Sequence, residues 1–331
     1  MPPEWFPHEC CFMAWPTRRS LWGDLFEQAR SDYAATARTI AAFERVVMIC
    51  APGRAPEVRS SCGGEVEVVE IAIDDSWTRD SGPIFVTNER GEIAVVDFAF
   101  NGWGGKYVPY DNDAALAAAL ADILGARCYK APIVLEGGAF FVDGEGTLLT
   151  TEGPLLHPER NPGRSKKDLE GVLFDYLGVD KVIWLTAAPD RDTDGHVDGI
   201  AQYVRPGCIA MLVPGEARCA NFAFARENLD RLAGETDARG RHIAVLPFSV
   251  AGSGTAGAQR VEVGYLNCYL ANGAVVFPLT GDASDEAARE RFGEIFPDRE
   301  IVGVPGATLS YGGGGPHCIT QQMPEGEVAT R

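Results

Sequence analysis

The sequence predicts one α/β domain that spans residues 1–331. Helix-plus-strand units recur about five times along the chain, and short apolar or alternating segments bounded by Gly and Pro lie between them. No long linker or low-complexity stretch divides the chain, and 46% hydrophobic residues can bury a large core. A doubly wound nucleotide-binding sheet is the competing architecture, but neither G-x-G-x-x-G nor G-x-x-x-x-G-K-S/T occurs.

Apolar periodicity gives the expected elements in order. Residues 32–43 carry Ala and Ile at helical spacing and lead into an apolar block at 45–50, which predicts a helix followed by a strand. Further helices are expected at 113–124, 168–177, 222–232 and 285–296. Further strands are expected at 84–86, 93–98, 140–142, 147–151, 181–185, 209–213, 242–246, 266–270, 275–277 and 300–304.

The negative net charge of the chain indicates which classes of binding partner to expect. The chain has 29 Lys+Arg against 47 Asp+Glu, a net charge of -18, which disfavours nucleic acid and favours small cations, although an acidic surface also serves solubility. No run of eighteen apolar residues occurs, and the first residues lack the features of a secretory signal. We therefore expect a cytoplasmic protein with no membrane partner.

The cysteines indicate a reducing environment. They are odd in number and include no C-x-x-C pair, which fits neither a disulfide framework nor a zinc ribbon. We expect reduced thiols at Cys10, Cys11, Cys50, Cys62, Cys128, Cys208, Cys219, Cys268 and Cys318.

The segment near the C-terminus indicates a cysteine nucleophile. Four glycines, 312–315, precede Pro316, His317 and Cys318. Glycines let a ligand approach the backbone closely, and a supported, accessible thiolate can attack a carbon centre. Cysteine is also among the most buried residue types, and Gly-rich runs are usually linkers, so a structural interpretation competes.

Three further segments carry candidate polar groups. His196 and Asp198 are two residues apart, so in an extended strand both would project to one face, where His196 could relay protons while Asp198 grips a cation. Trp77 and Asp80 precede an expected strand and could hold a guanidinium; alternatively Asp80 pairs with Arg79 and Trp77 fills the core. Glu136 lies between an apolar run and two glycines, where it either needs a partner such as a histidine or occupies an exposed turn. The histidine spacing does not predict a metal site.

These segments, taken together, resemble the guanidine-modifying superfamily, and most closely the agmatine deiminase family, which is grouped with bacterial-type peptidylarginine deiminases. The likeness covers nearly the whole chain. Its motifs are 1–8 (MPPEWFPH), 15–16 (WP), 77–83 (WTRDSGP), 100–105 (FNGWGG), 136–138 (EGG), 161–162 (NP), 193–198 (TDGHVD), 265–273 (YLNCYLANG) and 317–322 (HCITQQ).

The resemblance implies a fold, a reaction and a set of roles. The fold would be a five-fold pseudosymmetric α/β propeller (pentein) of ββαβ-type units, forming a single deiminase domain over residues 1–331. Cys318 would attack the guanidinium carbon, and His196 would serve as the acid/base. Asp80 and Asp198 would hold the guanidinium nitrogens, and Glu136 would orient the histidine. No metal or organic cofactor is implied, and a homo-oligomer is implied by the resemblance alone.

The family's expected reaction is hydrolysis of agmatine to N-carbamoylputrescine and ammonia through a covalent S-alkylthiouronium intermediate. Asp192 would contact the distal amine of agmatine, and Trp77 would line its apolar tether. Three alternatives stay open: a peptidylarginine deiminase, an amidinotransferase and a guanidine-binding protein without turnover. A papain-like protease is disfavoured because its nucleophile would lie near the N-terminus.

Overall fold

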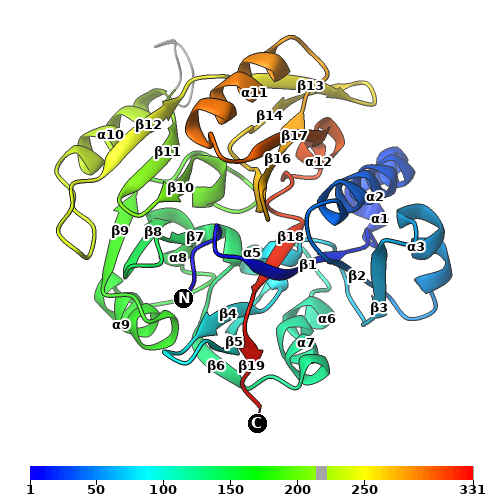
Figure 1. Ribbon diagram of the computed structural model, residues 1–331, viewed down its shortest axis with the longest axis horizontal. Helices are drawn as coiled ribbons and strands as arrows, with labels where there is room; N and C mark the ends of the chain where they lie inside the picture. The colour runs from blue at the N-terminus through cyan, green and yellow to red at the C-terminus, as the bar shows by residue number, and fades with distance from the viewer. Residues whose placement is uncertain (214–221, 331) are drawn as a thin grey trace.

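The computed structural model describes residues 1–213 and 222–330. Most of its sheets repeat one pattern, in which an antiparallel strand pair is followed by a helix and a third strand parallel to the second (Figure 1). In one such unit β7 (Phe140–Val142) is antiparallel to β8 (Thr147–Thr151), and β8 is parallel to β9 (Lys181–Leu185) after the crossover helix α9 (Lys166–Leu177). The parallel register pairs Leu148 with Val182.

The same pattern recurs in three other chain segments, which follow one another around the molecule in Figure 1. Their elements are β4 (Ile84–Thr87), β5 (Glu92–Ala99), α7 (Leu116–Leu124) and β6 (Cys128–Val134); β10 (Ala201–Arg205), β11 (Cys208–Leu212), α10 (Phe222–Ala233) and β12 (Ala244–Phe248); and β15 (Tyr269–Ala271), β16 (Ala274–Leu279), α11 (Ser284–Ile295) and β17 (Glu300–Pro305).

The two ends of the chain meet in one sheet. Strand β18 (Thr320–Pro324) is antiparallel to β1 (His8–Ala14), with Met13 opposite Thr320. Strand β1 is parallel to β2 (Val46–Cys50), which pairs with β3 (Val66–Glu70); α2 (Phe26–Ala41) and α3 (Ala55–Cys62) are the connecting helices. This pairing brings the segment before β18, which contains Cys318, to the middle of the molecule (Figure 1).

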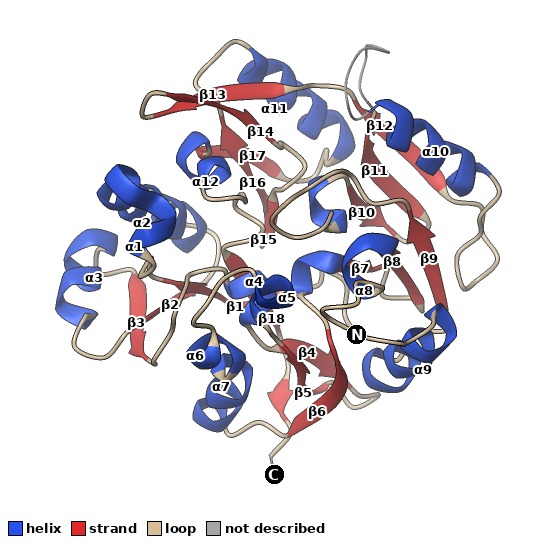
Figure 2. Ribbon diagram, turned by 180° about the vertical axis from the view of Figure 1, so that it is seen from behind, coloured by secondary structure: helices blue, strands red, loops and turns tan. Residues whose placement is uncertain are grey.

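Shorter elements complete the described chain. They are α1 (Arg19–Trp22), η1 (Gly23–Leu25), α4 (Thr78–Ser81), α5 (Gly102–Gly105), α6 (Asp111–Ala114), η2 (Gly137–Ala139), α8 (Glu152–Leu155), η3 (Val197–Gly199), the hairpin β13 (Gly252–Ala256) and β14 (Gln259–Val263), α12 (Ala307–Tyr311) and β19 (Glu327–Val328). Figure 2 shows the short helices α4 and α5 next to each other near the centre, with the longer helices at the periphery.

Local sequence explains where the longer elements begin and end. Ser165 and Asp168 form a capping box at the start of α9, and Gly178 ends that helix in the left-handed region at φ 64°. Every residue of β2 is buried, as expected for an apolar strand between two neighbours of a largely parallel sheet.

Most expected elements are confirmed within a few residues, and three expectations are wrong. Residues 113–124 form two helices, α6 and α7, which meet at Ala115. The strand expected at 266–270 begins only at Tyr269, because Asn267 N–H donates to the carbonyl of Gly264 and closes a turn. His196 and Asp198 do not lie on a strand, since residues 197–199 form the 3-10 turn η3.

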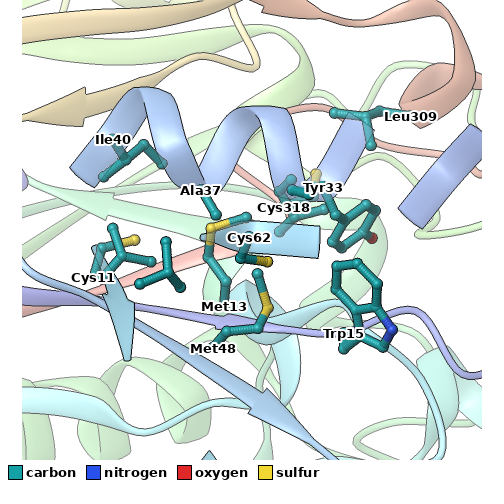
Figure 3. Close-up of a cluster of buried hydrophobic side chains, with 14 of the residues drawn as sticks. Cys11, Met13, Trp15, Tyr33, Ala37, Ile40, Met48, Cys62, Leu309 and Cys318 are labelled. Atoms are coloured by element: carbon teal, nitrogen blue, oxygen red, sulfur yellow. The ribbon is translucent and has the colours of Figure 1, made fainter. Parts of the chain in front are cut away.

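The largest buried cluster packs around α2 and β2 and extends to Cys318 (Figure 3). It includes Trp15, Trp22 and Tyr33, each almost completely buried. The eight cysteines in the described part of the chain are free thiols, as expected, whereas Cys219 lies outside it. In the same part of the chain, no helix combines the length and the apolar character needed to cross a bilayer.

Candidate active site

Cys318 lies immediately before β18, in a tightly packed loop. Its side chain is 8% exposed. Asn267 Nδ2 donates to Cys318 Sγ at 3.1 Å, and Asp198 Oδ2 lies 3.4 Å from the same sulfur. A Cβ at Gly314 would lie 2.9 Å from Cys318 Cβ and 2.6 Å from the Trp77 ring, so this position requires glycine. The glycine run therefore serves close packing beside the sulfur.

The surroundings of Cys318 favour the thiol in the substrate-free protein. Burial, followed by the negative charges of Asp198 and Asp80, raises the pKa of Cys318 well above its ordinary value. A cation placed between these carboxylates and the sulfur would lower the pKa of Cys318 again. Thiolate formation at Cys318 is thus coupled to the charge of whatever enters the site.

His196 faces three carboxylates. Its Nδ1 is 3.7 Å from Asp80 Oδ1 and its Nε2 is 3.8 Å from Glu136 Oε2, and neither ring nitrogen has a hydrogen-bond partner among the described residues. Burial opposes the charged ring, but Asp80, Glu136 and Asp198 outweigh burial and raise the pKa of His196 to about 9. His196 therefore carries a proton at neutral pH and has both nitrogens available for a ligand or water.

Asp80 is held by two donors. Trp103 Nε1 donates to its Oδ2 at 2.8 Å, and Gly138 N donates to its Oδ1 at 2.9 Å. Burial raises the pKa of Asp80, which the nearby His196 charge opposes. Arg79 does not pair with Asp80, contrary to the simplest structural interpretation; its Nη1 donates to Glu4 at 3.0 Å instead.

Asp198 is oriented by a histidine. His317 Nδ1 lies 2.8 Å from Asp198 Oδ2. Burial alone would raise the pKa of Asp198, but the hydrogen bond and charge of His317 outweigh it and lower that pKa. Asp198 is therefore ionised beside the sulfur of Cys318.

Gly138 lies at the point where these side chains converge. A Cβ built there would be 2.7 Å from His196 Nδ1 and 2.9 Å from both Asp198 Oδ2 and Asp80 Oδ1. The absence of a side chain at this position leaves room for the two carboxylates and the imidazole to face one space.

Glu136 precedes the turn η2 and is fully buried. Arg160 Nε donates to Glu136 Oε1 at 2.5 Å, whereas Glu136 Oε2 faces His196 and has no hydrogen-bond partner in the part of the chain that the structure describes. Burial opposes the charge of Glu136, but His196 and Arg160 outweigh burial and lower its pKa. The exposed-turn interpretation of Glu136 is therefore wrong.

A pocket of about 310 Å³ opens onto Cys318, His196 and Asp198. Asp192 also lines it, with its Oδ1 held by the Tyr107 hydroxyl at 2.6 Å. Trp77 is not among the lining residues; its ring stacks on Trp22 in the core at 5.9 Å between centroids. Within the described ranges, no group of three or more His, Cys, Asp or Glu side chains is arranged to hold a metal ion.

Sequence reasoning missed the residues that hold this set together. Asn267 contacts Cys318, Arg160 binds Glu136, and His317 binds Asp198. His317 also binds Glu4, the fourth residue of the chain, through its Nε2 at 2.9 Å. The positions of His317 beside Cys318 and of Glu4 in the first motif were the available signals, but the contact itself spans 313 residues.

Comparison with known proteins agrees with the geometry. A model of the Porphyromonas-type peptidyl-arginine deiminase family matches residues 1–324. The chain belongs to this family.

Relatives and solved structures cover nearly its whole length. A Legionella pneumophila protein named "Putative agmatine deiminase" is 39% identical over 329 residues, which are 98% of this chain and 94% of that protein. The solved agmatine deiminase of Enterococcus faecalis has a TM-score of 0.94 at 35% identity and covers 98% of this chain and 95% of that one. The more distant structure of a dimethylarginine dimethylaminohydrolase, at 12% identity and a TM-score of 0.55, covers 96% of this chain and shares the mixed α/β fold.

Proposed function

We propose that this protein is an agmatine deiminase, which hydrolyses agmatine to N-carbamoylputrescine and ammonia. The observation that carries the proposal is that the protonated His196 and the carboxylates of Asp80 and Asp198 face one another at Gly138, with the Cys318 sulfur 3.4 Å from Asp198 Oδ2. A planar guanidinium between two carboxylates would present its carbon to the sulfur. The family and the agmatine deiminase relatives support the same reaction.

The groups suffice for a two-stage hydrolysis. The bound guanidinium lowers the cost of ionising Cys318, the thiol proton passes to solvent water through the open pocket, and the thiolate adds to the guanidinium carbon. His196 gives its proton to the departing nitrogen, so the C–N bond breaks, ammonia leaves, and an S-alkylthiouronium group stays on the sulfur. Neutral His196 then takes a proton from water, the hydroxide adds to the same carbon, and the C–S bond breaks to release the ureido product.

Glu136 supports the proton-transfer step. Its unpartnered Oε2 lies 3.8 Å from His196 Nε2, while Arg160 holds the other oxygen. The carboxylate favours the protonated ring and fixes its orientation. Glu136 is therefore the group that orients the acid/base.

The charge of the pocket favours agmatine over substrates that carry an α-carboxylate. Asp190, Asp192 and Glu262 line it beyond the reacting groups, and none of its lining residues in the described ranges is Lys or Arg. These carboxylates attract a distal amine and repel the carboxylate of free arginine. Asp192, held by Tyr107, is the proposed contact for the amine. Trp77 supports the nucleophile loop from the core side, where its ring contacts Gly314.

Peptidylarginine deimination is the second candidate, because the family model is that of peptidyl-arginine deiminases. For the architecture, we propose that residues 1–331 form a single domain and that the repeated strand-helix units form the five-fold propeller of the superfamily. The repeated sheet pattern supports this arrangement. A homo-oligomer stays an expectation from the resemblance, and a cytoplasmic location stays an expectation from the sequence.

The test is release of ureido product and ammonia by purified protein supplied separately with agmatine, free arginine and an end-blocked arginyl peptide. Cys318→Ser is the control. Turnover of agmatine in preference to the others is the expected result. Preference for the peptide would transfer the assignment to protein citrullination, and no turnover of any of the three would refute a deiminase function.

A further inference from the structure

We propose that His317 is a positioning residue whose imidazolium, held between Asp198 and Glu4, keeps Asp198 ionised and aimed at the substrate beside Cys318. This inference rests on the proposed function and assigns a role to two residues outside the reacting set. His317 is completely buried and precedes the nucleophile in sequence.

The contacts of the ring determine its protonation. His317 Nδ1 lies 2.8 Å from Asp198 Oδ2, and Nε2 lies 2.9 Å from Glu4 Oε1. Ionised carboxylates only accept hydrogen bonds, and a neutral imidazole has a single N–H to donate. A neutral ring would therefore leave one nitrogen lone pair directed at a carboxylate oxygen. The imidazolium satisfies both contacts.

Of the other charged groups around His317, some favour its protonation and others oppose it. Arg79 Nε donates to the His317 carbonyl at 3.3 Å, while Arg79 Nη1 binds Glu4 at 3.0 Å. Burial and the charge of Arg79 oppose protonation of His317, but Glu4 and Asp198 outweigh them and raise its pKa. Glu4 itself has its pKa lowered to about 2: burial opposes its ionisation, and the charges of Arg79, His317 and His8 overcome burial. The Phe141 ring, 5.1 Å away between centroids, adds no charge.

The charge balance of the buried centre gives the imidazolium a function. Among the described residues, each of four buried carboxylates in this centre lies within 4 Å of a nitrogen of an arginine or a histidine. Glu4 contacts Arg79 and His317, Asp80 contacts His196, and Asp198 contacts His317. Glu136 contacts Arg160, which also binds Asp194. If His317 lost its proton, Asp198 would face Cys318 Sγ at 3.4 Å without its charged partner. Asp198 would then be harder to keep ionised, and it would no longer be fixed toward the guanidinium.

Glu4→Gln tests this role, and it also removes the charged partner of Arg79. A glutamine oxygen can still accept from His317 Nε2, but the charge that favours the imidazolium is gone. The alkaline limb of kcat/KM for agmatine should move to lower pH, with a loss of about tenfold or more at pH 8.5 and a much smaller loss at pH 6. His317→Asn, which cannot titrate, should lose activity by a similar factor at both pH values.

The chain offers a matched control in another buried His–Glu pair. His8 Nδ1 lies 3.1 Å from Glu44 Oε2, and Glu44 also accepts from the hydroxyl of Tyr269. Neither His8 nor Glu44 contacts Asp198 or Cys318 through its side chain. His8 Nε2 does lie 2.9 Å from the backbone carbonyl of Glu4, so Glu44→Gln also controls for changes transmitted through His8, while the Glu4 carboxylate and its contact with His317 stay in place. Glu44→Gln should lower the thermal unfolding temperature about as much as Glu4→Gln but leave the pH profile at its wild-type position.

The outcomes separate the claims. The positioning role would be overturned if the alkaline limb of kcat/KM in Glu4→Gln lay at the same pH as in the wild type. An equal shift of that limb in Glu44→Gln would overturn it as well. Nitrogen-15 NMR of histidine-labelled wild-type protein provides a readout that does not need agmatine or a variant. An imidazolium signal from His317 at pH 7.5 is expected, and a neutral ring would overturn the proposal. Absence of agmatine turnover together with that imidazolium signal would refute the substrate assignment alone.

Discussion

Adding one methyl group at Gly138 is the most informative perturbation of the site. In Gly138→Ala the new Cβ would lie 2.7 Å from His196 Nδ1 and 2.9 Å from Asp80 Oδ1 and Asp198 Oδ2. Ordinary contacts of a Cβ are 3.4 Å or longer. At least three side chains must therefore move apart by about half an ångström or more, in a centre where they are packed on every side.

Such a displacement predicts a large kinetic effect. A shift of about 1 Å in reacting groups can cost on the order of 10²-fold in rate, so kcat/KM for agmatine should fall about a hundredfold. The displaced carboxylates of Asp80 and Asp198 would also hold the guanidinium less well, so KM should rise. The assay is ammonia release at several agmatine concentrations, together with thermal unfolding to show that the variant is folded.

Gly171→Ala is the matched control. Gly171 lies within α9, and a Cβ there would meet nothing within 4 Å. The substitution should leave kcat/KM unchanged and should not destabilise the helix. A folded Gly138→Ala protein with wild-type kcat and KM would refute the convergence of Asp80, Asp198 and His196 on the substrate.

Three further results are expected. Asp80→Asn and Asp198→Asn should each lower kcat/KM for agmatine by about tenfold to a hundredfold, because each removes one charged hydrogen bond to the guanidinium; unchanged steady-state constants in both would contradict that assignment. Asp192→Asn should raise KM for agmatine about tenfold but leave KM for butylguanidine, which has no distal amine, unaltered; equal effects on both compounds would exclude an amine contact. Because the pKa of His196 is raised to about 9 from about 6.5, its charged form stabilises the fold fully below pH 6.5 and is lost as pH rises through 9. The difference in unfolding free energy between wild type and His196→Asn should therefore shrink by roughly 3 kcal/mol from pH 6.5 to 9.5 in denaturant titrations, and a constant difference would contradict the raised pKa.

Local sequence patterns predicted the strands and helices that pair or pack with elements nearby in the sequence. Residues 140–142, 147–151 and 181–185 have the predicted bounds because each contains adjacent apolar residues and is followed by a polar residue. Strand β1 was not predicted, since it depends on pairing with β18, more than 300 residues later. The strand predicted at 266–270 begins only at Tyr269, and the turn in its place directs the side-chain amide of Asn267 to Cys318.

The sequence indicated the groups that we propose to react but not the residues that hold them in place. Cys318, His196 and Asp198 line one pocket, as the motifs suggested. The expected common strand face of His196 and Asp198 was wrong, because a 3-10 turn directs Asp198 to Cys318 and His196 to Asp80 and Glu136. Periodicity carries no information on contacts such as that of His317 with Glu4, which are 313 residues apart in the chain.

The central claim is that Cys318 becomes covalently attached to the amidino carbon of agmatine during turnover. Acid quenching of the wild-type protein with excess agmatine, followed by mass spectrometry of the peptide that contains Cys318, tests it directly. The predicted result is an adduct equal in mass to agmatine minus ammonia on that cysteine, and neither adduct nor product in Cys318→Ala. Turnover by Cys318→Ala, or an adduct on another residue, would contradict the account.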